Sequence, residues 1–229
     1  MTGDRYFSDE LFKFLRELAE NNNRPWFQAN KDRYDRHVKE AALRFIEDFA
    51  PRLRKISPHF VADPRPVGGS LFRIYRDARF SKDKSPYKTN VGVRFTHEAG
   101  RDVHAPGYYL GIANDGIFAA CGVWHPDSKS LGKIRQAIVE DPTAWKRARN
   151  AKRFSESFEL EGDALKTAPR GFDPEHPLIE DLRRKDFVGV SKLTKKALTG
   201  PDLMPRFTEL CRSAATFQRF LCAALGVEY

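Results

Sequence analysis

The sequence is poor in the features that mark several common classes of protein. It has three cysteines in 229 residues, too few for a disulfide framework, and we expect reduced, buried thiols. Its longest apolar run, 220–227, falls well short of the ~20 residues that span a bilayer. The start of the chain lacks the basic and apolar regions of a signal peptide, and its early acidic residues disfavour a transit peptide. We therefore expect a cytoplasmic protein with no membrane segment.

Motifs of the common enzyme classes are missing as well. The sequence has no HExxH motif, no cysteine pair at zinc spacing, no GxSxG elbow, no Walker A loop and no dinucleotide-binding GxGxxG. We therefore expect no metal site and no cofactor. These absences disfavour the common hydrolases, NTPases and dehydrogenases, although they leave rarer enzyme classes open.

Positive charge, in contrast, is plentiful. Lys and Arg number 40 against 31 Asp and Glu, which gives a formal net charge of +9. Hydrophobic residues make up 41% of the chain, and 18 of them are Phe, so the composition is that of a globular protein with a bulky core. The basic balance favours a partner that carries phosphate.

The charge is concentrated in one stretch, residues 71–90. Six basic and two acidic residues give this stretch a net +4 out of the chain's +9. Cations this close repel one another, so either local carboxylates or an anionic ligand must compensate them. The residues expected to bind the anion are Arg73, Arg76, Arg79, Lys82, Lys84 and Lys88.

Several further residues are expected to contribute to the anion site, either in proton transfer or in support of the basic residues. Asp77 is one candidate for proton transfer, and His176, held in a defined loop between prolines, is the other. The alternative for His176 is a capping or surface role. A polar cluster at a helix start, within residues 21–31, would either add anion contacts, since helix N-termini attract anions, or serve only turn formation and packing. The supporting residues are Asp77, Asp83, Trp26, Asn30 and Arg170.

Aromatic residues interleave with these cations and leave two functions open. Tyr75, Phe80 and Tyr87 would stack on bases, as in single-strand nucleic-acid binders, or would pack into the core. The first function is binding of a phosphorylated or other anionic small molecule, with or without catalysis. The alternative is a non-enzymatic nucleic-acid-binding module that uses the same basic face.

Hydrophobic spacing predicts an α+β fold. Helical spacing covers residues 8–56, with Pro51 expected to kink or end the second helix. A period of two then predicts a sheet within 70–125. The expected strands are centred on 72–76, 91–95, 108–112 and 117–123, an antiparallel meander.

Helical signals return after Pro126. Asp127 or Ser128 is expected to cap one helix and Asp141 the next, and the last helix should run from 203 to 225. We expect one domain, residues 1–229, with helices in 8–56, a sheet in 70–125 and a mainly helical part in 127–229. The sheet would pack against the N-terminal and C-terminal helices.

These motifs together resemble an uncharacterised family, widespread in bacteria and known as domain of unknown function 2461. The resemblance is carried by Asn22 to Phe27 with Asn30, Lys31 and Tyr34, by Phe72 to Asp77, Arg79 to Lys84 and Pro86 to Thr89, by Gly122 to Pro126, and by Pro169 to Phe172 with His176 and Pro177. It covers nearly the whole chain, with the basic stretch as its most specific part. It implies one full-length domain and no particular activity.

Overall fold

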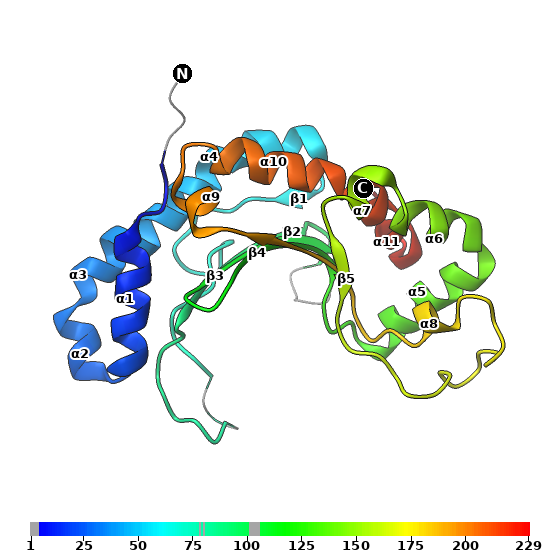
Figure 1. Cartoon of the computed structure of the whole chain (residues 1–229), viewed down its shortest axis with the longest axis horizontal. Helices are drawn as coiled ribbons and strands as arrows, with labels where there is room; N and C mark the ends of the chain where they lie inside the picture. Colours follow the sequence, from blue (N-terminus) through cyan, green and yellow to red (C-terminus); the bar gives the residue numbers. More distant parts are fainter. Residues whose placement is uncertain (1–4, 78, 80, 101–105) are drawn as a thin grey trace.

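An antiparallel sheet runs through the middle of the molecule (Figure 1). The computed structural model describes residues 5–77, 79, 81–100 and 106–229. Within these residues the sheet has six strands in the order β1-β2-β3-β4-β6-β5. The strands are β1 (Phe60–Val61), β2 (Asn90–His97), β3 (Gly107–Ala113), β4 (Ile117–Val123), β5 (Glu159–Glu161) and β6 (Phe187–Leu193). Helices and an antiparallel sheet together confirm the expected α+β class.

Helices precede and follow the sheet strands in the chain. Before β1 they are α1 (Asp9–Glu20), α2 (Arg24–Ala29), α3 (Lys31–Tyr34), the π-helical turn η1 (Asp35–Lys39) and α4 (Glu40–Ile56). After β4 they are α5 (Ser128–Glu140), α6 (Pro142–Arg149), α7 (Lys152–Ser155), α8 (Ile179–Leu182), α9 (Lys195–Thr199), α10 (Leu203–Ser213) and α11 (Ala215–Leu225). None of these described helices has the length and apolar character that a membrane crossing requires.

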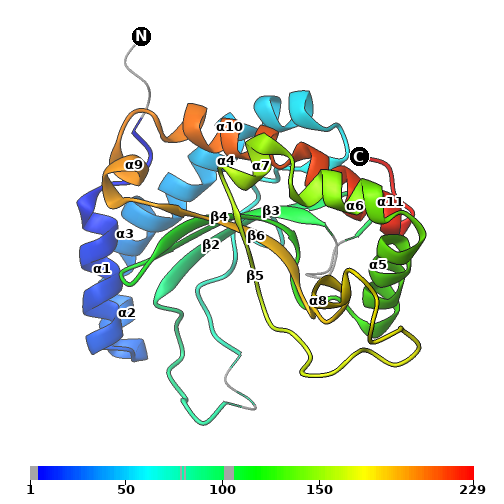
Figure 2. The same cartoon turned by 45° about the vertical axis from the view of Figure 1, so that its right-hand side comes forward.

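One face of the sheet is covered by α4 and α10, which lie side by side along it (Figures 1 and 2). The ring of Phe49 lies 4.8 Å from that of Phe95 on β2 and 5.0 Å from that of Phe207 on α10. These three side chains are almost completely buried. Aromatic packing of this kind removes a large apolar area from water and fixes the two helices on the sheet.

The opposite face carries no helix within the described part of the chain. Figures 1 and 2 show this face open between α1–α3 at one end and α5 and α8 at the other. Side chains alternate along a strand, so the two faces differ in composition. On β2, Val93 and Phe95 are buried under the helices, whereas Arg94 and Thr96 are half-buried on the open side.

The meander prediction is correct for β2, β3 and β4, which are consecutive hairpin partners. The strand expected at 72–76 is not a strand of the sheet. Leu71 forms an isolated bridge to Val93, and the chain then leaves β2, so Tyr75 bridges Tyr87 instead. The sheet also extends beyond the expected 70–125, because β5 and β6 come from residues 159–193.

Two helix boundaries differ from the prediction. Helix α4 continues through Pro51 to Ile56, because the buried Leu53 holds the last turn against the core and offsets the hydrogen bond that proline removes. The single helix expected over 203–225 is two, α10 and α11, which meet at Ala214. The Ser213 hydroxyl donates to the Leu210 carbonyl (2.9 Å) and so competes with the helical pattern there.

Candidate functional site

Residues 73–88, called the basic loop from here on, lie below the open face of the sheet (Figure 2). The loop folds back on itself around the Tyr75–Tyr87 bridge. Its backbone donates from Arg76 to Pro86 (2.9 Å) and from Lys88 to Ile74 (2.7 Å). The basic stretch is therefore an antiparallel loop that closes on itself at Tyr75 and Tyr87, outside the six-stranded sheet, and not the connection between two sheet strands that the sequence predicted.

Local carboxylates compensate two of the loop's guanidinium groups. Arg76 pairs with Asp83, and Arg79 donates twice to Asp77, from Nε at 2.9 Å and from an Nη at 2.7 Å. Hydrogen bonds from Arg79 lower the pKa of Asp77 to about 2. Hydrogen bonds from Ser85 and, to a smaller extent, the hydrogen bond from Arg76 lower the pKa of Asp83. A pKa of about 2 makes the Asp77 carboxylate a weak base, and both of its oxygens accept from Arg79, so it orients that guanidinium.

The remaining cations of the loop differ in their surroundings. The Lys88 ammonium donates to the Arg73 carbonyl (3.0 Å) and is half-buried, so desolvation, and then the Arg73 charge, lower its pKa. The Lys84 ammonium lies 3.4 Å from the Arg79 carbonyl, and Lys82 and Arg73 are exposed. Phe80 lies outside the described residues.

The polar cluster at the start of α2 meets the basic loop through Asn22. Its side-chain amide donates to the Tyr87 carbonyl (3.0 Å) and its oxygen accepts from the Tyr87 backbone N–H (3.1 Å). The Tyr87 ring stacks on Phe27 with 4.1 Å between the ring centres. The expected supporting residues Trp26 and Asn30 instead bond to each other, from the Asn30 amide to the Trp26 carbonyl. Asn22 therefore anchors the loop to the helical end of the molecule.

A cleft of about 410 Å³ lies on the open face of the sheet. This volume lies within the range of small-molecule sites, ~300–1,000 Å³. Aromatic side chains dominate its walls, and Arg94, Thr96 and Glu161 contribute polar groups. The apolar lining includes Phe72, Tyr109, Phe118, Trp124, Val188 and Val190.

Two glycines on neighbouring strands, Gly92 on β2 and Gly111 on β3, make room for these rings. A Cβ at Gly92 would lie 2.4 Å from the Tyr109 hydroxyl, and one at Gly111 would lie 2.6 Å from the Phe118 ring. Glycine at both positions therefore lets Tyr109 and Phe118 lie across the sheet, 5.7 Å apart between ring centres. Burial raises the pKa of Tyr109, so its phenol remains a hydrogen-bond donor at neutral pH.

Phe72 joins the cleft to the basic loop. The Arg94 guanidinium lies 5.3 Å from the centre of the Phe72 ring, and the Lys88 ammonium lies at the same distance. Both distances are within the ~6 Å of a cation–π contact. One wall of the cleft is thus an aromatic ring approached by two cations, one from the sheet and one from the loop.

His125 and Asp186 form a pair beside the opposite part of the cleft. The Asp186 side chain is only 1% exposed, and its Oδ1 lies 3.1 Å from His125 Nδ1 and accepts the His125 backbone N–H at 2.6 Å. The His125 side chain is 53% exposed. Its ring lies 4.2 Å from that of Trp124, which lines the cleft. This pair was not predicted, because His125 was one of six scattered histidines and Asp186 carried no signal.

The other expected site residues lie apart from this pair. The His176 Nδ1 accepts from the Leu178 backbone N–H (3.1 Å), a local bond within the loop before α8. Arg170 is exposed in the loop that precedes α8. Neither residue lines the cleft. Among the described residues, no three His, Cys, Asp or Glu side chains gather as a metal ion would require.

One protein family matches nearly the whole chain, including all of the sequence motifs described above. The chain belongs to the family described as conserved hypothetical protein DUF2461. The match covers residues 10–220. No curated protein matches the chain. The family description names no activity, so a function has to be argued from the geometry.

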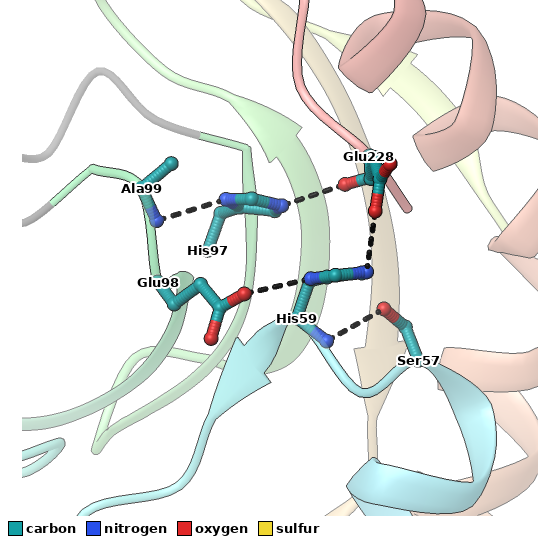
Figure 3. A network of polar contacts seen from close by, with 6 residues as sticks. All are labelled: Ser57, His59, His97, Glu98, Ala99 and Glu228. Carbon is teal, nitrogen blue, oxygen red and sulfur yellow. Dashed lines mark hydrogen bonds and ion pairs between the residues drawn. The ribbon is translucent and has the colours of Figure 1, made fainter.

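The DUF2461 match includes the basic loop, the cleft and the His125–Asp186 pair. Of the polar network in Figure 3, it includes every residue except Glu228. His59 contacts the side chains of Glu98 (2.7 Å) and Glu228 (3.4 Å). The buried His97 accepts from the Ala99 N–H at Nδ1 (3.1 Å), so its Nε2 donates to the Glu228 carbonyl (2.6 Å). Two histidines thus hold residue 228 beside β1 and β2.

Proposed function

We propose that the protein binds an anionic small molecule on the open face of the sheet. The apolar part of the ligand would lie in the cleft against Tyr109 and Phe118. Its anionic group would meet Arg94 and the basic loop at Lys88. The main observation behind this proposal is the position of Phe72. Its ring forms part of the cleft wall, and the charged groups of Arg94 and Lys88 each lie 5.3 Å from the ring centre.

The proposal places the ligand's charge where the loop meets the sheet. Two loop guanidinium groups, those of Arg76 and Arg79, already have carboxylate partners. Lys88 is half-buried, and a partly desolvated cation interacts more strongly with an anion than an exposed one does. Arg94 and Lys88 therefore provide the first contacts, and the rest of the loop supplies a surrounding positive field.

A pair of fluorescent probes that differ in charge tests this proposal. We expect 8-anilinonaphthalene-1-sulfonate, an aromatic anion, to bind with enhanced emission and to bind more tightly than neutral N-phenyl-1-naphthylamine. Replacing Arg94 by Met should weaken the anionic probe about tenfold, or ~1.4 kcal/mol, and leave the neutral probe unchanged. Arg52→Met, on the far side of α4, is the matched control.

A second variant separates the cleft from nonspecific binding. Ala120 lines the cleft, so Ala120→Trp should fill it and weaken both probes. The Ala120→Trp variant must keep a far-ultraviolet circular dichroism spectrum and a cooperative thermal transition close to those of the unmodified protein. This control is needed because partly unfolded proteins also bind the sulfonate. Equal binding of the sulfonate to the unmodified protein, Arg94→Met and Ala120→Trp would refute the proposal.

The alternative function, nucleic-acid binding, is supported by Tyr75, whose exposed ring (51%) lies among the loop's cations. Single-strand binders use such rings as stacking platforms. A single-stranded oligonucleotide added to the same titrations distinguishes the two functions. Affinity that falls by ~0.7 log units per log unit of salt for each phosphate contact, and that is lost in Tyr75→Ala, would favour nucleic acid.

A further inference from the structure

We propose that His125 and Asp186 form a general-base pair that activates a water molecule or a substrate hydroxyl beside the cleft. This proposal rests on the proposed function for the position of the substrate. It assigns a reaction class, proton abstraction that leads to hydrolysis or a related transfer, to a protein for which the cleft alone suggests binding. His125 is the catalytic residue and Asp186 the positioning residue.

The two residues come together from distant parts of the chain. His125 follows β4 and Asp186 precedes β6, and the pairing of Val123 with Phe187 brings these strand ends together. The carboxylate contacts His125 at two atoms, the backbone nitrogen and Nδ1. Among the described residues, Nε2 has no hydrogen-bonding partner. The carboxylate thus lies 3.1 Å from Nδ1 and bonds to the backbone of the same residue, while Nε2 is accessible to act as a base.

The backbone around the carboxylate is shaped to keep it in place. His125 has a φ of 48°, in the left-handed region that residues with a side chain rarely adopt. Gly162 has a φ of 113°, and a Cβ there would lie 2.5 Å from the Asp186 side chain. The next residue, Asp163, donates its backbone N–H to Asp186 Oδ2 (3.1 Å). Strained residues of this kind concentrate at functional sites.

A purely structural role accounts for Asp186 but not for the His125 imidazole. Backbone N–H groups of His125 and Asp163 already satisfy the buried carboxylate in part, and any residue except proline at 125 would supply the first of them. The His125 side chain is more than half exposed, so burial gains little from it. Its ring instead lies against Trp124, an exposed aromatic residue (58%) that lines the cleft.

The chemistry can be written for an activated ester. The Nε2 lone pair takes a proton from water, and the resulting hydroxide equivalent attacks the ester carbonyl carbon. The bond from that carbon to the leaving oxygen breaks, releasing the alkoxide or phenolate and the carboxylic acid, which loses its proton to solvent. The imidazolium, stabilised meanwhile by Asp186, returns its proton to solvent or to the leaving group.

Hydrolysis of p-nitrophenyl acetate by the full chain is the test. We expect a turnover rate that falls about tenfold or more in His125→Asn. Asparagine is the replacement of choice because it tolerates left-handed backbone, so the fold should survive. The matched control is His37→Asn, which removes another partly exposed histidine, from η1, and should leave the rate unchanged.

The role of Asp186 requires a readout that a structural role would not change. In Asp186→Asn, we expect both a loss of rate and a change in the His125 tautomer, seen in two-bond proton–nitrogen spectra of the imidazole. A rate that is the same in the unmodified protein and in His125→Asn would overturn the proposal. An equal loss in His37→Asn would also overturn it, because it would mark nonspecific catalysis by surface imidazoles.

The experiments test the binding proposal and the general-base proposal independently. His125→Asn should bind 8-anilinonaphthalene-1-sulfonate as the unmodified protein does. If the sulfonate does not bind but hydrolysis depends on His125, the binding proposal fails and the general-base pair stands. If the sulfonate binds through Arg94 and hydrolysis is independent of His125, the general-base pair fails alone.

Discussion

The carboxylate of Asp77 is held by one guanidinium, and this determines the pH at which it takes up a proton. Its pKa is lowered to about 2 by the hydrogen bonds from Arg79. An unperturbed Asp titrates near 3.9. Because the folded pKa is the lower one, the contact contributes to loop order above about pH 4 and is lost as the pH falls toward 2. We predict a carboxyl carbon titration for Asp77 centred near 2.

Removal of the guanidinium is the control for this prediction. In Arg79→Gln, the Asp77 titration should move up toward ~3.9, while the titration of Asp83, which is held by Ser85 and Arg76, stays low. An Asp77 midpoint near ~3.9 in the unmodified protein would contradict the pairing.

At the scale of elements, Asn22 connects the turn before α2 to the basic loop. Its side chain makes two hydrogen bonds to the Tyr87 backbone. We predict that Asn22→Ala lowers the free energy of unfolding by about 1–2 kcal/mol. The same change should speed tryptic cleavage within the basic loop several-fold, because the loop loses its anchor. Limited proteolysis with mass spectrometry measures the second effect.

Asn21→Ala provides the comparison, since the Asn21 side-chain amide donates to the Glu17 carbonyl of the preceding helix α1. Cleavage of the loop should stay at the unmodified rate in this variant. Equal cleavage rates in Asn22→Ala and the unmodified protein would show that the loop is held by other contacts.

Elements with strong periodicity were predictable from the sequence, and β6 was not. Strands β2, β3 and β4 alternate between a buried face and a less buried one, and the spacing in α1 is that of an amphipathic helix. In β6 both faces are apolar where Phe187 packs against Trp145 and Val188 and Val190 line the cleft. A strand without a polar face gives no alternation to detect.

At the scale of the whole molecule, the C-terminal residues are tied to the sheet through His97. The buried ring bridges the Ala99 N–H and the Glu228 carbonyl (Figure 3). We predict that His97→Ala lowers the free energy of unfolding by about 1–3 kcal/mol. Urea unfolding measures the loss. His37→Ala, on η1, should change stability by less than about 0.5 kcal/mol, and an equally small change in His97→Ala would contradict the bridging role.

Contacts between residues that are distant in the sequence limit how much of the site the sequence reveals. The basic stretch was visible because its residues are contiguous, and its local ion pairs follow from spacings of two and seven residues. The cleft and the His125–Asp186 pair depend on which strands are neighbours. Residues 125 and 186 are 61 positions apart, and only the insertion of β6 beside β4 brings them together.

This strand order has a consequence for biosynthesis. Translation delivers His125 early, when β4 has β3 as a partner but β6 has not yet been made. Strand β6 ends at Leu193, so the ribosome must pass that codon, and the segment must leave the exit tunnel, before the pair and the far wall of the cleft can exist. A truncated or stalled nascent chain would display the basic loop without the pair, so any activity of this site begins only when most of the protein has been synthesised.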